Sequence, residues 1–238
     1  MIGITFALPS ESSELIRRLE SRRRVGKLIF GKIDPPSPRL GRAGNHDVAI
    51  VHTGVGAKYC NERLELLIHK ARPRLIISAG FAGAVTDELH AGDLIMAENF
   101  SDPSLLNRAT EILRERVQPV KLFTSTSLVD SVDERNEIAR ASGAATVDME
   151  TGGIVAACRA HGVPLLSLRV ISDTPSEPFP APMSILFDFQ TQRTDYIGLA
   201  AYLLGNPSAI WRLSRFFAKI KQVRAKLADA IVELVLNL

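Results

Sequence analysis

Short apolar runs alternate with amphipathic stretches along most of the chain. Runs rich in β-branched residues predict strands at 2–7, 26–33, 47–54, 74–80, 92–100, 120–124, 144–148 and 164–172. Apolar residues at helical spacing predict helices over 10–20, 57–70, 130–140, 149–161, 191–204 and 207–235. This alternation indicates an α/β fold, with a mostly parallel sheet that helices cover on both faces.

Two stretches rich in turn-forming residues interrupt the pattern, at 34–46 and 174–190. Neither has the composition of a long linker, and the sequence contains no internal repeat. The simplest organisation is one catalytic domain over 1–206. A C-terminal amphipathic helix over 207–238 would then pack on that domain or be appended to it.

Composition narrows the function classes. The 238 residues are 46% apolar and 23% charged, which is typical of a globular protein and excludes collagen-like or disordered chains. The two cysteines are too few for a disulfide framework and match no zinc-binding spacing, which favours a reducing, cytoplasmic location. The N-terminus has no signal-peptide pattern, and no run of 18 apolar residues predicts a membrane span. A net charge of +3 is too small to favour nucleic-acid binding.

This positive charge is concentrated at the C-terminus. Residues 207–238 contain six lysines and arginines against two acids, a local charge of +4, so the other 206 residues sum to −1. On a helical wheel the apolar face holds Leu213, Phe216, Phe217, Ile220, Val223 and Leu227, and a basic face holds Arg212, Arg215, Lys219 and Lys226. Such a helix either docks on the body with a solvated basic face or contacts an anionic membrane surface through 207–230.

Candidate chemistry lies where predicted strands end. Glycine or polar residues follow four strands, at 7–11, 53–57, 80–83 and 169–173, and Asp148–Glu150 stands where a short strand meets a helix. In α/β sheets, ligands bind at this carboxyl edge. The glycine segments predict turns that either cradle an anion, as Gly54 would, or only reverse the chain.

Three carboxylates stand out among these residues. Asp173 ends an apolar strand, so we expect burial to raise its pKa and make it a proton donor near neutral pH. Glu11 and Glu150 lie at the starts of predicted helices. Stabilisation of a helix dipole would explain both of these acids equally well.

Read together, these segments resemble the 5′-methylthioadenosine/S-adenosylhomocysteine nucleosidase and purine nucleoside phosphorylase superfamily. The matching segments are IGITFALPSE at 2–11, HTGVGAKYC at 52–60, ISAGFAGAVTDELHAGDLI at 77–95 and TVDMETGGIVAACRAHGVPLLSLRVISD at 146–173. The last of them is the most specific. The resemblance implies a three-layer α/β/α sandwich with a mixed, mostly parallel sheet, usually assembled as a dimer or larger homo-oligomer.

The resemblance also implies an activity, the cleavage of the N-glycosidic bond of a purine nucleoside without cofactor or metal. Asp173 would protonate the base, Glu11 would activate water, and Glu150 would bind the ribose 2′-hydroxyl. Arg169 and Ser172 would hold Glu150 and Asp173 in place. The remaining expected contacts to the nucleoside come from Ala7, Gly80, Phe81, Ala82, Gly83, Leu128, Val129, Asp148 and Met149.

Three departures from the family pattern leave alternatives open. Phe81 replaces a serine or threonine beside the glycines, and the segment between Asn99 and Val120 is short, which predicts a more open 5′ side of the site. The loop at 174–190 and the C-terminal helix are longer and different.

A phosphorylase would need an anion site, for which Thr53, Gly54 and Gly56 offer donors but no arginine is well placed. The basic helix is similar to that of hopanoid-associated members, which implies a lipid-linked nucleoside as an alternative substrate. A non-catalytic nucleoside-binding module is the third alternative.

Overall fold

The computed structural model describes residues 1–35, 46–54, 57–179, 202 and 205–238. Within them a ten-stranded sheet has the order β2-β3-β4-β1-β5-β10-β6-β7, and β9 pairs with β5 and β8. The strands are β1 (Ile2–Phe6), β2 (Glu20–Val25), β3 (Leu28–Lys32), β4 (Asp47–His52), β5 (Ile76–Ala84), β6 (Leu94–Ala97), β7 (Val117–Val120), β8 (Leu122–Thr124), β9 (Thr146–Asp148) and β10 (Leu165–Asp173). The helices are α1 (Pro9–Arg17), α2 (Ala57–Ala71), α3 (Pro103–Leu113), the short η1 (Arg114–Arg116), α4 (Val132–Ser142), α5 (Thr151–Ala160) and α8 (Pro207–Asn237).

The four central strands, β4, β1, β5 and β10, are parallel. Ile4 lies opposite Ile50 of β4 on one side and Ile77 of β5 on the other. Their carboxyl ends therefore meet at one edge of the sheet. Antiparallel pairs occur at β2–β3, β3–β4, β6–β10 and β5–β9, which makes the sheet mixed.

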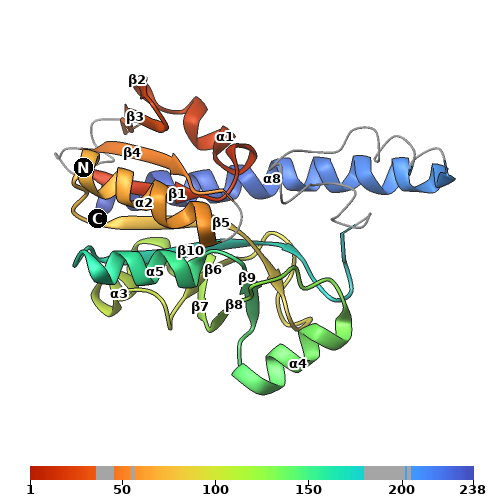
Figure 1. The fold of residues 1–238 in the computed structure, drawn as a ribbon. Coiled ribbons are helices and arrows are strands. Elements are labelled where there is room, and N and C mark those ends of the chain that lie inside the picture. Colours follow the sequence, from red (N-terminus) through yellow and green to blue (C-terminus); the bar gives the residue numbers. More distant parts are fainter. Residues whose placement is uncertain (36–45, 55–56, 180–201, 203–204) are drawn as a thin grey trace.

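Helices cover both faces of the sheet, and successive strand residues point to opposite faces. Ile77 faces the core beneath α1, α3 and α8, whereas Ile76 faces the core beneath α2 and α5. Figure 1 shows these layers. The predicted three-layer α/β/α sandwich with a mixed, mostly parallel sheet is thus confirmed.

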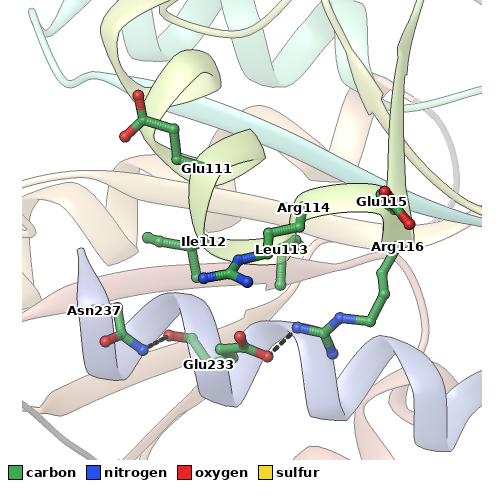
Figure 2. A pocket seen from close by; sticks show the side chains of 8 residues that line it. All are labelled: Glu111, Ile112, Leu113, Arg114, Glu115, Arg116, Glu233 and Asn237. Carbon is green, nitrogen blue, oxygen red and sulfur yellow. Dashed lines mark hydrogen bonds and ion pairs between the residues drawn. The ribbon is translucent and has the colours of Figure 1, made fainter.

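The two halves of α8 have different surroundings. Leu227, Ile231 and Leu234 are fully buried in the main core. Figure 2 shows the C-terminal turns of α8 against α3 and η1, where Glu233 pairs with Arg116 across a hollow. The N-terminal half continues past the edge of the sheet (Figure 1), and there Trp211 is 63% exposed. No helix in the described part of the chain is both long and apolar enough to cross a membrane.

Several local predictions were wrong. The helix expected to reach residue 20 ends at Arg17, and the exposed polar residues after it form β2, an edge strand without an apolar pattern. The glycine-rich segment 80–83 is not a turn but lies inside β5. The strand expected at 92–100 is limited to β6, and α3 was missed. Apart from residue 202, the helix expected at 191–204 lies outside the described residues, and so does most of the loop at 174–190.

The prediction for the apolar face of α8 was wrong at one position. Leu213, Ile220, Val223 and Leu227 are buried as expected, but Phe217 is 52% exposed. The basic face is partly used within the protein, because Lys219 pairs with Glu177 and Lys226 donates a hydrogen bond to the Gly92 carbonyl. Much of the local charge therefore serves to fasten α8.

Candidate functional site

The first candidate carboxylate, Glu11, is held in place by two backbone amides. One oxygen accepts a hydrogen bond of 2.9 Å from the Leu8 N–H at the start of α1, and the other accepts one of 3.2 Å from the Phe81 N–H of β5. Gly80 permits this approach, since a Cβ there would lie 3.2 Å from Glu11 Oε1. Burial raises the pKa of Glu11, although these amide hydrogen bonds oppose the rise.

Glu150 lies across a small cavity from Glu11. Ala7, Glu11, Gly80, Phe81 and Glu150 are among the residues that line this cavity. Burial, reinforced by the negative charges of Asp148 and Glu11, raises the pKa of Glu150 to about 8. At neutral pH the Glu11–Glu150 pair therefore carries less than two negative charges. Met149, which directly precedes Glu150, is half-buried.

Asp148 belongs to a separate buried network. Its carboxylate accepts hydrogen bonds from Arg169 at 3.0 Å, from the Thr124 hydroxyl at 3.1 Å and from the Thr151 hydroxyl. Arg169 also donates to the carbonyl and the hydroxyl of Ser78. We expected Arg169 to hold Glu150, but among the described residues Arg169 forms its ion pair with Asp148 and not with Glu150. Asp148 and Arg169 thus fix the junction between β9 and α5. The effect of Arg169 on Glu150 is electrostatic: its positive charge opposes the rise in the pKa of Glu150.

Asp173, at the end of β10, is 2% exposed and has two partners. The Ser172 hydroxyl donates to one oxygen at 2.6 Å, as expected, and the Arg135 guanidinium forms an ion pair with the other. Burial raises the pKa of Asp173, while Arg135 and the Ser172 hydroxyl oppose the rise. Gly83 lies opposite Asp173 across β5–β10, where a Cβ would be 3.1 Å from the carboxylate.

Arg135 is the main residue that the sequence analysis missed. It comes from α4, is 2% exposed, and also donates to the Ala84 carbonyl at 2.5 Å and the Val129 carbonyl at 3.4 Å. It thereby ties the half-buried segment with Leu128 and Val129 to Asp173. The only sequence signal was an arginine in the first turn of a polar helix, and that position usually lies in solvent.

The two parts of the site are joined by β5 and β10. Gly80 lies beside Glu11 and Gly83 beside Asp173. Three residues of a strand span about 10 Å, which is the separation of the two glycines along β5. Ala82, between the glycines, is buried and its carbonyl accepts a hydrogen bond from the Ser172 hydroxyl.

The residues expected for an anion site are engaged elsewhere. The Thr53 hydroxyl hydrogen-bonds to the Phe6 carbonyl at 3.2 Å, and the Gly54 amide donates to the Ala7 carbonyl at 3.0 Å. Gly54 has a φ of +77°, a backbone conformation that suits glycine. Gly56, the other glycine of this segment, lies outside the described residues.

Comparisons with known proteins show which proteins and solved structures this chain is similar to. It is 24% identical over 204 residues to 5′-methylthioadenosine/S-adenosylhomocysteine nucleosidase of Staphylococcus aureus. This match covers 73% of this chain and 86% of that protein. The solved structure of the same nucleosidase from Campylobacter jejuni matches with a TM-score of 0.73 and 18% identity, over 100% of this chain and 99% of that one. Futalosine hydrolase of Helicobacter pylori matches with a TM-score of 0.69 and 17% identity, over 98% and 96%.

The two structural likenesses establish the fold, and a family match goes further. The family model described as the phosphorylase superfamily matches residues 1–119 and 98–202, which together include all the residues of the candidate site. The chain therefore belongs to the phosphorylase superfamily.

Proposed function

We propose that this protein hydrolyses the N-glycosidic bond of an adenine nucleoside, with 5′-methylthioadenosine and S-adenosylhomocysteine as the first substrates to test. The observation that carries the proposal is the set of three carboxylates with raised pKa near the carboxyl ends of β1, β5 and β10, of which Glu11 and Asp173 are buried and Glu150 is half-buried. The names of the similar proteins, which are nucleosidases and a hydrolase, support the reaction class.

The proposed reaction assigns the base to Asp173, and the sugar and the attacking water to Glu150 and Glu11. Asp173 gives its proton to N7 of the base as the bond between C1′ and N9 breaks, so the base leaves as a neutral molecule. Positive charge develops on the ribose, as in other glycoside hydrolysis. Glu150 contacts the 2′-hydroxyl, and Met149 packs on the sugar. Water attacks C1′ and loses its proton to Glu11.

We favour hydrolysis over phosphorolysis for two reasons. Glu11 lies where an attacking phosphate would have to approach, and its carboxylate would repel that anion. The hydroxyl of Thr53 and the amide of Gly54 already have partners inside the protein. The test incubates the protein with methylthioadenosine, S-adenosylhomocysteine, adenosine and inosine, with and without phosphate, and measures free base and sugar product. Strict phosphate dependence and a sugar 1-phosphate would overturn hydrolysis.

Two variants test the roles directly. We expect Asp173→Asn and Glu11→Gln to abolish base release while far-UV circular dichroism stays unchanged. Asp93→Asn is the control, because Asp93 ends a turn outside the candidate site. Tight adenosine binding by the wild-type protein without any release of adenine would favour the binding-module alternative.

We also propose that the N-terminal half of α8 contacts an anionic membrane surface. Ile210, Trp211 and Phe217 are more than half exposed, and Arg215 stacks on the Trp211 ring at 4.6 Å. Exposed apolar side chains beside arginines suit the interface of an acidic bilayer. Such a contact would fit the alternative of a lipid-linked nucleoside substrate, which base release from a 5′-lipid nucleoside would test.

The membrane test uses point variants, because deleting α8 would remove part of the core. Full-length protein and the double variant Trp211→Ser/Phe217→Ser are sedimented with anionic and with neutral vesicles. We expect the wild type to bind anionic vesicles and the variant to lose binding. Equal binding of both proteins would overturn the contact. We also propose, as the alternative, that this exposed face contacts a second copy of the chain in a homo-oligomer. Analytical ultracentrifugation of the same two proteins tests that alternative.

A further inference from the structure

Three side chains with metal-binding atoms meet at the end of α5 that lies away from Glu150. Glu65 and His69 stand one turn apart on α2, and His161 is the C-cap of α5. His69 Nε2 lies 2.9 Å from one carboxylate oxygen of Glu65, and His161 Nε2 lies 2.7 Å from the other. The two imidazole rings meet edge to face, with centroids 5.3 Å apart. One ligand atom from each residue lies within 4.8 Å of the others.

This arrangement matches the needs of a zinc ion. Bond lengths of about 2.0–2.2 Å in a tetrahedral site place ligand atoms roughly 3.3 Å apart, so only small side-chain rotations are required. Two imidazoles and one carboxylate form a known zinc donor set, with the fourth position left to water. The side chains of His69 and Glu65 are 66% and 45% exposed, which leaves that position open to solvent.

The backbone adds an electrostatic preference for a cation. His69 lies in the last turn of α2 and His161 at the end of α5, and these helices pack together. Both helices therefore direct their C-terminal, partly negative ends toward the cluster. Figure 1 shows α2 and α5 on the same side of the sheet.

We propose that Glu65, His69 and His161 form a binding site for a divalent transition-metal ion, with Zn²⁺ as the best fit. The ion would fasten α2 to α5. The ten residues of α5 span about 15 Å, so the ion would not touch the cavity at the other end of that helix. Its effect is on the stability of the helix whose first turn follows Glu150, and not on the bond-breaking step.

The test uses full-length protein without a histidine tag, stripped with a chelator and then dialysed. Zn²⁺ is titrated by isothermal calorimetry into the wild type, His69→Gln, His161→Gln and the control His90→Gln. His90 is 82% exposed and stands apart from the cluster. Glutamine can keep a hydrogen bond to Glu65, and the replaced rings lie at the surface, so we expect all variants to fold.

We expect one equivalent of Zn²⁺ to bind to the wild type and to His90→Gln, and to raise the thermal midpoint of both. Each cluster variant should bind at least about tenfold more weakly and lose the thermal shift. No binding to the wild type, or equal binding to all four proteins, would overturn the proposal. So would a thiolate charge-transfer band with Co²⁺, because it would place the ion on Cys60 or Cys158 instead.

Discussion

The ion pair between Arg135 and Asp173 gives the sharpest prediction about stability and pH. Replacing Arg135 with methionine fills similar space but leaves the Asp173 carboxylate with only the Ser172 hydroxyl as a partner. Both side chains of the pair are at most 3% exposed, so water cannot replace the lost guanidinium. Breaking a buried pair from one side costs about 3–5 kcal/mol. We expect Arg135→Met to lose that much stability at pH 8.

The free-energy cost of Arg135→Met should depend on pH, because a proton on Asp173 removes the unpaired buried charge. Burial raises the pKa of Asp173 and Arg135 opposes the rise, so the variant keeps its proton to higher pH than the wild type. A carboxyl whose folded pKa is raised stabilises the protein at low pH and loses that contribution as pH rises through the folded value. The loss of stability should therefore be smallest near pH 5. It should grow toward pH 8 by at most about 1.4 kcal/mol per pH unit.

Urea unfolding of both proteins between pH 5 and pH 8 measures these energies. Arg140→Met is the matched control, because Arg140 lies exposed on the same helix, and we expect a change below about 0.5 kcal/mol. In an Asp173→Asn background the loss from Arg135→Met should fall to about 1–3 kcal/mol, since only hydrogen bonds such as that to the Ala84 carbonyl remain to be broken. A penalty that is independent of pH and unchanged by Asp173→Asn would refute the reasoning.

Three further predictions follow from single residues. Gly83→Ala should lower activity while the fold survives, because its Cβ would press on Asp173 and Arg135; the control Gly153→Ala meets nothing within 4 Å and should keep full activity. The rate of base release at low substrate should fall as pH is lowered through a pKa above the usual carboxyl range, because Glu11 must be ionised and burial raises its pKa; a rate that is flat down to pH 4.5 would contradict this. Leu234→Ala should cost about 2–5 kcal/mol in urea unfolding, because Leu234 is fully buried, whereas Phe217→Ala on the exposed part of α8 should cost little.

The sequence was sufficient to predict the buried central strands, but it was insufficient to predict the edge strand β2 and the full length of β5. Apolar runs such as 164–172 become β10, which is buried along its whole length, and a fully buried strand needs no polar alternation to be recognised. β2 has all six residues exposed, so its pairing with β3, and not its own pattern, makes it a strand. The strand β5 continues through Gly80 and Gly83 because both residues pair with β10, a tertiary fact that local turn propensity cannot reveal.

The candidate site divides in the same way. Residues at strand ends could be found from the sequence, because parallel strands bring their carboxyl ends to one edge. Arg135 could not, since it lies on a helix 38 positions before Asp173 and its contacts with Asp173 and the Ala84 carbonyl are tertiary. Arg169 shows the converse case: its importance was predicted, but its contacts run to Asp148, because the short β9 turns that carboxylate inward.

The environments of the carboxylates explain how similar groups can take different roles. Glu150 has burial and two negative neighbours, so its pKa is raised to about 8 and it tends to be neutral. Asp173 is more deeply buried than Glu150, but Arg135 and Ser172 stabilise its ionised form. A general acid works best when its pKa lies near the working pH, because a carboxyl that binds its proton too tightly donates it poorly. Burial shifts the pKa of Asp173 in that direction and Arg135 opposes the rise, which favours release of the proton to a departing base. Removing Arg135 should therefore shift the basic limb of the pH–rate profile upward while the maximal rate falls.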